Sequence, residues 1–357
     1  GILMTTLKIS SQIRYWDQSP TRKISTTDRH GRTIEVAYFP LVQFTGLSKH
    51  YPLPLIFSYK NNNLYLPLRE KFMSLERGTI YEVGDMTFEG ELPQVQKTVD
   101  VPMFYFVYNM ANYYHFIYDT LPYLFSYFNE KKIHPDMKLL VSPPEGQNDL
   151  YPFVWDSLNM LGITKDDVVF LDPEVMYNRV CVSSSLTHNG LSNCPPHRGV
   201  FDTLNSMESD YVGPEKIYIS RRTWVHNKKD NIGTDYTERR RCVNEDQVVQ
   251  IFKLYGFKEI FCENLTMEEK IGMFRTAKYI AGPIGGGMCN TIFSPPDTRV
   301  LSINSPTFMD VNLRFAYSMV HTDLYNFEHT EFVDKQEGSV ESEGSLSISG
   351  GLNSPWQ

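Results

Sequence analysis

The sequence contains few cysteines and no arrangement of them typical of a disulfide framework or a structural zinc site. Small disulfide-stabilised domains and zinc modules need closely spaced or paired cysteines. Here five cysteines are scattered through 357 residues, and no two form a Cys-x-x-Cys pair. We therefore expect mostly reduced or buried thiols at Cys181, Cys194, Cys242, Cys262 and Cys289.

Long apolar runs and a surplus of positive charge are also missing. No apolar stretch approaches the roughly 20 residues that a membrane span needs. The formal net charge is -8, whereas proteins that coat nucleic acid or anionic membranes need a basic surface. We predict no nucleic-acid partner and no membrane span in this chain, although a local basic pocket is compatible with the composition.

The first residues, GILMTTLKISSQ, lack the charged and then apolar plan of a signal peptide. With Met4 as the natural start, we expect a cytoplasmic protein. The alternative is the lumen of the Golgi or endoplasmic reticulum, if an N-terminal anchor has been removed.

The length and the order of apolar segments predict an α/β protein with two main domains. Short apolar runs separated by Pro, Asn and Gly favour strands up to residue 95. Alternating strand and helix patterns follow, with helices expected over 112–128, 150–162, 244–255, 267–278 and 288–293. We predict a β-rich region over 1–95, α/β domains over 96–212 and 213–333, and a mobile Ser-, Gly- and Glu-rich tail over 334–357.

Three consecutive glycines, Gly285, Gly286 and Gly287, lie between a short apolar strand and an expected helix. Backbone N–H groups in such a loop can approach a phosphate closely, and the helix N-terminus favours negative charge. The alternative is a tight turn that only permits close packing. The segment G-P-I-G-G-G does not match the dinucleotide pattern G-x-G-x-x-G, which makes a nicotinamide oxidoreductase a distant alternative.

Arginines gather near the ends of elements in the same half of the chain. Arg221 and Arg222 end the strand KIYIS, and residues 239–241 are three arginines before the helix expected to be capped at Asn244. Strand C-termini and helix N-termini meet at one edge of a parallel sheet, so these side chains can converge on the anion that the glycines would bind. The alternative is a solvated basic loop.

His115 and Asp119 are one turn apart on the helix that begins near Asn112, so they share a face. A carboxylate can orient an imidazole and stabilise the imidazolium formed when it accepts a proton. Pro122 should kink or end this helix. The alternative is a buried pair that only ties the helix down.

Several of these segments, taken in order, resemble glycosyltransferase family 61. The motifs are N-Y-Y-H-F-I-Y-D-T-L-P, Y-I-S-R-R, R-C-V-N-E-D, G-F-K-E-I-F-C-E-N-L-T-M-E-E-K-I and A-G-P-I-G-G-G-M-C-N. They span about 100 to 300, and residues before 95 contain no motif of the family. The family includes plant xylosyl- and arabinosyltransferases and animal O-linked N-acetylglucosaminyltransferases.

The resemblance implies a GT-B architecture, in which two Rossmann-like domains with parallel sheets face a cleft, and inversion at the anomeric carbon without a metal or other cofactor. The sequence also lacks Asp-x-Asp, the usual manganese-diphosphate motif of the other main glycosyltransferase fold. The expected co-substrate is a nucleotide-sugar, UDP-linked, with xylose or N-acetylglucosamine as leading candidates, and the acceptor is a hydroxyl of a glycan or glycoprotein.

Carried over position by position, the family pattern assigns His115 and Asp119 to the acceptor side as candidate catalytic residues. The donor-side candidates are Arg221, Arg222, Arg241, Asn244, Glu245, Glu263, Gly285, Gly286, Gly287 and Asn290. Ile284 departs from the pattern, because many members have His there. This departure permits a rival interpretation, a glycosyltransferase-like binding or scaffold protein without catalytic activity.

Overall fold

The computed structural model describes most of the chain. The described residues are 6–16, 22–25, 30–46, 53–67, 72–74, 79–81, 87–188, 190–222, 242–304, 308–319, 325–329, 331–332 and 346–347. The candidate Arg241 lies outside them, together with its neighbours 239–240. The predicted mobile tail, 334–357, also lies outside them apart from a short strand at Leu346–Ser347.

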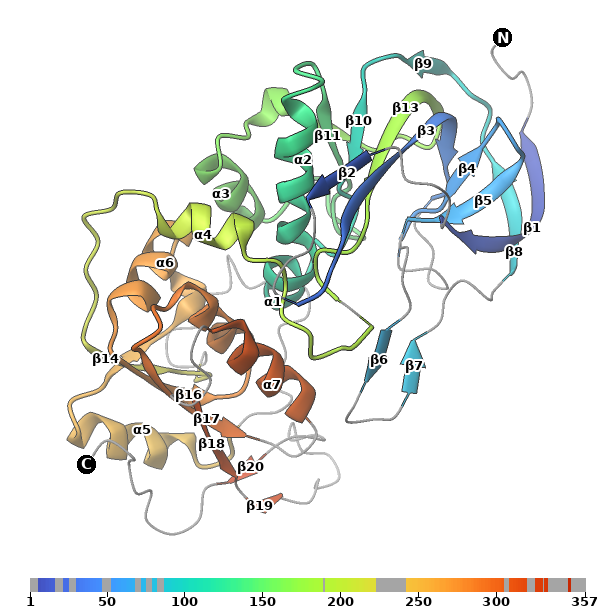
Figure 1. Ribbon diagram of the computed structural model, residues 1–357. Helices are drawn as coiled ribbons and strands as arrows, with labels where there is room; N and C mark the ends of the chain where they lie inside the picture. The colour runs from blue at the N-terminus through green and yellow to red at the C-terminus, as the bar shows by residue number, and fades with distance from the viewer. Residues whose placement is uncertain are drawn as a thin grey trace. The chain divides into compact units, whose positions relative to one another are not determined.

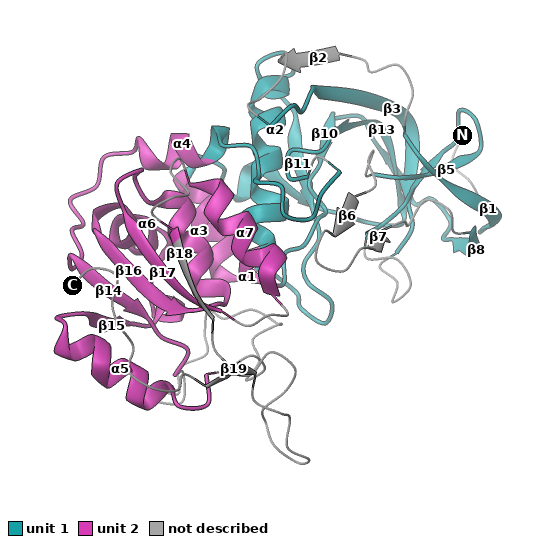
Figure 2. Cartoon of the chain, turned by 60° about the horizontal axis from the view of Figure 1, so that its bottom comes forward, with its two compact units in different colours: residues 1–111, 115–150, 161–200 teal, residues 112–114, 151–160, 201–357 magenta. Residues whose placement is uncertain are grey.

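The chain divides into two compact units (Figure 2). Unit 1 contains residues 1–111, 115–150 and 161–200, and unit 2 contains 112–114, 151–160 and 201–357. Two short segments from the middle of the chain, 112–114 and 151–160, therefore belong with the C-terminal unit. The domain boundaries expected from the sequence stay a prediction, as does the GT-B arrangement.

Unit 1 is built on a sheet of eleven strands in which the N-terminal strands continue a parallel core (Figure 1). The parallel core has the order β12-β11-β10-β13, and β3 then pairs antiparallel with β13. The core strands are β10 (Met103–Tyr105), β11 (Lys138–Val141), β12 (Val168–Phe170) and β13 (Val175–Ser183). The others are β1 (Leu7–Tyr15), β2 (Arg22–Ser25), β3 (Ile34–Phe44), β4 (Ile56–Ser58), β5 (Asn63–Leu66), β8 (Thr87–Leu92) and β9 (Lys97–Val99).

The N-terminal strands bury their own apolar face. Ile9, Ile13, Phe57 and Leu64 belong to one cluster of buried side chains on this part of the sheet. The sequence shows β-type runs here, and the sheet joins them to the α/β core through the β3–β13 pairing. A separate hairpin consists of β6 (Phe72–Ser74) and β7 (Thr79–Tyr81).

The helical segment predicted over 112–128 is confirmed, but its hydrogen bonding changes along its length. It comprises α1 (Tyr113–His115), a π-helical turn at Phe116–Thr120, a 3-10 turn at Leu121–Tyr123 and α2 (Leu124–Lys131). Pro122 has no N–H to donate to the carbonyl four residues earlier, so regular α-helix cannot continue through it. The proline interrupts the pattern without ending the helical segment.

Unit 2 contains a five-stranded, fully parallel sheet in the order β15-β14-β16-β17-β18. Numbered along the chain this is 2-1-3-4-5, a common order of doubly wound sheets. The strands are β14 (Lys216–Ile219), β15 (Lys258–Ile260), β16 (Tyr279–Pro283), β17 (Arg299–Asn304) and β18 (Tyr325–His329). The predicted parallel block is therefore confirmed, with β18 as a strand that the sequence did not indicate.

The helices predicted in this half are also confirmed, with short shifts of their ends. They are α3 (Pro152–Met160), α5 (Glu245–Leu254), α6 (Met267–Thr276) and a 3-10 helix at Gly286–Phe293. Thr266 and Glu269 form the predicted capping box of α6. Gly256, with φ of +86°, and Gly162, with φ of +81°, follow α5 and α3 in the left-handed conformation.

Several short elements complete the described structure. Helices α4 (Gly199–Asn205) and α7 (Met309–Ser318) were not predicted. Two 3-10 turns lie at Lys165–Asp167 and Cys262–Asn264, and β19 (Glu331–Phe332) pairs with β20 (Leu346–Ser347). Within the described part of the chain, no helix has the length and apolar character needed to cross a membrane.

Candidate active site

Each parallel sheet has one position where the strand order reverses direction. In unit 2 it lies between β14 and β16, and in unit 1 between β10 and β13. The chain connections that follow these two neighbouring strands run to opposite sides. A crevice therefore opens outside the carboxyl ends of the strands, and ligands of α/β sheets bind in it. Both positions carry residues that the sequence had singled out.

In unit 2 the reversal point brings together Arg221, Glu245 and the start of the glycine loop. Arg221 lies two residues after the end of β14, and its Nη1 donates to the Ile284 carbonyl oxygen at 3.0 Å. The Arg221 backbone N–H donates to Glu245 Oε1 at 2.9 Å. A permanently charged guanidinium therefore lies against the loop that was expected to bind a phosphate.

The three glycines of the loop have different steric surroundings. A Cβ at Gly285 would lie 2.0 Å from Arg221 Nη1, and one at Gly287 would lie 2.6 Å from Ile219 Cγ2. A Cβ at Gly286 would meet nothing within 4 Å. Gly285 has φ of 168°, which any residue can adopt. Position 285 therefore requires glycine because Arg221 approaches so closely. At Gly287 the reason is the other one expected from the sequence, close packing, here against Ile219.

Ile284, which replaces the family's usual histidine, is a core residue of unit 2. Its side chain is 2% exposed, and its N–H donates to the Ile303 carbonyl at 2.9 Å, which extends the β16–β17 pairing. An isoleucine here contributes apolar packing and no ionic contact. Any positive charge near the loop must come from other residues, of which Arg221 is one.

Glu245 is a buried carboxyl group beside Arg221. It is 1% exposed, and its Oε1 also accepts a hydrogen bond from the Tyr218 hydroxyl at 3.2 Å. Its Oε2 is buried and has no hydrogen-bond partner among the described residues. Burial raises the pKa of Glu245 to about 7, against the smaller opposing effect of the hydrogen bond from Arg221.

This raised pKa makes a prediction about stability. Because the folded-state pKa of about 7 exceeds the usual glutamate pKa of 4.5, the contribution of Glu245 is fully present below pH 4.5 and is lost as the pH rises through 7. Relative to wild type, Glu245→Gln should gain about 3 kcal/mol of unfolding free energy between pH 4 and pH 8. Urea unfolding across this range measures it, with the exposed Glu208→Gln as control. Parallel pH profiles of wild type and Glu245→Gln would contradict it.

The remaining donor-side candidates have structural partners in unit 2. Arg222 makes a bidentate ion pair with Glu259, Nη2 to Oε1 at 2.6 Å and Nε to Oε2 at 2.8 Å, and its Nη1 lies 2.6 Å from Asp246 Oδ1. These carboxylates raise the pKa of Arg222 above its usual value. The guanidinium is thus engaged within the protein, and its predicted role in donor binding stays a prediction.

The two amide candidates differ in what they contact. Asn290 is fully buried, its Nδ2 donates to the Gly287 carbonyl at 3.0 Å, and its Oδ1 accepts from the Tyr113 hydroxyl. Asn244 occupies the N-cap position of α5, but its side chain makes no capping hydrogen bond there and instead accepts from Cys242 Sγ at 3.3 Å. Glu263 lies partly exposed in the 3-10 turn Cys262–Asn264.

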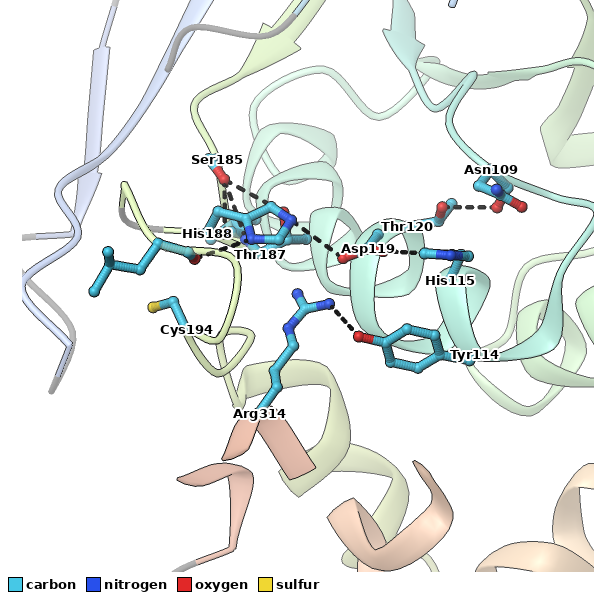
Figure 3. Close-up of polar contacts among 12 residues, drawn as sticks. Asn109, Tyr114, His115, Asp119, Thr120, Ser185, Thr187, His188, Cys194 and Arg314 are labelled. Carbon is cyan, nitrogen blue, oxygen red and sulfur yellow. Dashed lines mark hydrogen bonds and ion pairs between the residues drawn. The ribbon is translucent and has the colours of Figure 1, made fainter. Parts of the chain in front are cut away.

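In unit 1 the reversal point brings His115 and Asp119 together with a second histidine (Figure 3). His115 Nδ1 lies 2.7 Å from Asp119 Oδ2, as the one-turn spacing predicted. His188 Nε2 lies 3.4 Å from Asp119 Oδ1. One carboxylate therefore contacts two imidazoles, one from the helical segment after β10 and one from the loop after β13.

His188 was not identified from the sequence. The Ser185 hydroxyl accepts the backbone N–H groups of Thr187 at 3.3 Å and of His188 at 3.1 Å, which fixes the loop that carries the imidazole. The only available signal was a histidine shortly after a predicted strand, RVCVSSSLTH. His188 comes close to Asp119 only because β13 pairs directly with β10. The local sequence does not show that pairing.

The geometry of the pair suits proton transfer at His115. An ionised carboxylate only accepts hydrogen bonds, so Nδ1 of the imidazole donates to Asp119. The neutral ring then has its lone pair on Nε2, and its side chain is 47% exposed, so solvent-borne groups can reach it. This arrangement can accept a proton and stabilise the resulting cation.

Comparison with known protein families gives one match. The family model described as Glycosyltransferase 61 matches residues 113–301, which include His115, Asp119, His188 and the glycine loop. A comparison with curated proteins finds no match.

Proposed function

Because the chain belongs to glycosyltransferase family 61, we propose that it transfers a sugar from a UDP-linked donor to a hydroxyl group of a glycan or glycoprotein, with inversion at the anomeric carbon. The family supports glycosyltransferase activity. The proposal includes a GT-B arrangement and a reaction that requires no metal. Xylose and N-acetylglucosamine are the leading donor sugars.

The observation that carries the donor side is the packing of Arg221 against Gly285 at the strand-order reversal of unit 2. Nη1 is held by the Ile284 carbonyl at 3.0 Å, and Gly285 leaves the room that the guanidinium occupies. A preorganised guanidinium together with loop N–H groups can stabilise the charge that develops on a departing diphosphate. We assign Arg221 and the glycine loop to the leaving group.

On the acceptor side we assign proton abstraction to Nε2 of His115. The acceptor hydroxyl oxygen forms a bond to the anomeric carbon while its proton moves to Nε2, and the bond from that carbon to the diphosphate oxygen breaks. The electron pair leaves with the nucleoside diphosphate. Asp119, 2.7 Å from Nδ1, orients the ring and stabilises the imidazolium. Asp119 as the base itself is the alternative.

A thermal-shift panel of UDP-, GDP- and CMP-sugars tests the donor class. A ligand at 100 times its Kd stabilises the folded protein by about 2.7 kcal/mol, so the UDP-linked sugars are expected to raise the Tm and the others are not. A transfer and hydrolysis assay with the stabilising donors then tests catalysis. Binding without turnover for any donor would favour the inactive binding protein, and stabilisation only by GDP- or CMP-sugars would overturn the UDP assignment.

A further inference from the structure

Lys270 is a buried lysine in the first turns of α6. The residue is 2% exposed. Its Nζ lies 4.0 Å from the centroid of the Tyr113 ring, a cation–π contact. Burying an ammonium group is costly, and a cation–π contact offsets only part of that cost.

The ionisable neighbours of Lys270 belong to unit 2 and include both thiols and carboxylates. The groups that influence it electrostatically are two buried thiols, Cys262 and Cys289, and two carboxylates, Asp156 and Glu263. The thiols stay protonated, because burial raises the pKa of Cys262 to about 12 and that of Cys289 well above its usual value. Desolvation lowers the pKa of Lys270.

A chain of contacts connects Lys270 to the glycine loop. The ring of Tyr113 faces Nζ, and its hydroxyl donates a hydrogen bond to Asn290 Oδ1. Asn290 Nδ2 in turn donates a hydrogen bond to the Gly287 carbonyl. On the other side, a Cβ at Gly287 would lie 3.4 Å from Cys262 Sγ. The 3-10 helix that begins in the loop also contacts α6. Lys270 thus lies next to the loop assigned to the diphosphate.

The position of Lys270 in its helix adds a second electrostatic cost. It is the fourth residue of α6, close to the positive end of the helix dipole, where an ammonium group is disfavoured and an anion is favoured. A phosphate bound beside Nζ would offset this cost. The N–H groups at this helix end are accepted by protein side chains, Met267 N by Asp156 Oδ2 and Glu269 N by Thr266 Oγ1. Ile284, with its side chain 2% exposed, leaves the loop without the histidine that many family members have.

We propose that Lys270 is a donor-phosphate contact, whose ammonium group approaches the diphosphate held by the glycine loop and supplies positive charge there in addition to Arg221. This inference rests on the proposed function, because it takes the diphosphate of the nucleotide-sugar as the ligand. It assigns a binding role to a residue that the sequence did not single out.

Isothermal titration calorimetry with UDP, inorganic pyrophosphate and uridine tests the contact in wild type and Lys270→Met. Losing a hydrogen bond to a charged group should weaken UDP and pyrophosphate binding by about 10- to 100-fold. Uridine binding should stay unchanged, since it carries no phosphate. The Tm of the free variant should equal or exceed that of wild type, because a buried charge is removed.

The matched control is Lys278→Met, which removes an exposed lysine shortly after the same helix. It should bind UDP as wild type does. If Lys270→Met fails to fold, Lys270→Gln is measured by the same criterion, and failure of both to fold would show that the lysine is structural and overturn the contact.

The possible outcomes separate this contact from the proposed function. Wild-type affinity for UDP in either folded Lys270 variant overturns the contact alone. If wild type binds neither UDP nor pyrophosphate, the donor assignment itself fails, and the role of Lys270 fails with it.

Discussion

Replacing His115 by alanine is expected to lower the turnover of sugar transfer by about 10²- to 10⁴-fold, the usual contribution of a general base. The substitution removes Nε2, the atom assigned to accept the proton of the acceptor hydroxyl. The half-exposed side chain contributes little packing, so the protein should stay folded. Initial rates with a stabilising UDP-sugar measure the effect, and circular dichroism confirms the fold.

Asp119→Asn distinguishes the two possible bases. If His115 is the base, the asparagine variant keeps the hydrogen bond to Nδ1 in part and loses the stabilisation of the imidazolium, so turnover falls less than in His115→Ala. If Asp119 is the base, the order is reversed. His134→Ala is the matched control, because His134 packs edge-on against Tyr38 and has no assigned role in the reaction. Near-normal transfer by both His115→Ala and Asp119→Ala would show the assignment to be wrong.

Replacing Gly285 by alanine is expected to weaken UDP binding and to lower the unfolding free energy by about 1 kcal/mol, the usual net contribution of one hydrogen bond. The added Cβ would lie 2.0 Å from Arg221 Nη1, so the guanidinium must leave the Ile284 carbonyl. Calorimetry with UDP and urea unfolding measure the two effects.

Gly286→Ala is the steric control for this experiment, because its Cβ would meet nothing within 4 Å. Its unfolding free energy should change by no more than about 0.5 kcal/mol. A double-mutant cycle tests the cause: in an Arg221→Ala background the clash is gone, so Gly285→Ala should cost less stability than in wild type. Equal costs in both backgrounds would contradict the steric explanation.

Local structure followed closely from local sequence. The parallel strands of unit 2 are short apolar runs, and helix ends are marked by residues such as Thr266 and Gly256, whose effects depend on neighbours within a few positions. The His115–Asp119 contact was predictable for the same reason, because residues one turn apart share a helix face. The interruption at Pro122 was also expected, although its division into π and 3-10 turns was not.

Partners distant in sequence were not predictable. Arg222 carries the same charge as Arg221 one position earlier, yet it pairs with Glu259 and Asp246. Both arginines were predicted to bind the donor, because the sequence does not show which carboxylates the fold brings near each guanidinium. His188 and Lys270 were overlooked for the same reason, since their neighbours come from other strands and helices.

The glycine loop shows which features follow from local sequence and which follow from tertiary structure. The sequence by itself determined that a glycine-rich loop follows a buried strand, because three adjacent glycines and the flanking apolar residues are local features. Only the tertiary structure decided that Gly285 is needed for the passage of Arg221, that Gly287 is needed for packing on Ile219, and that Gly286 is unconstrained. Those distinctions arise from the pairing of β14 with β16, and pairing between strands separated by about 60 residues depends on the folding of the whole sheet.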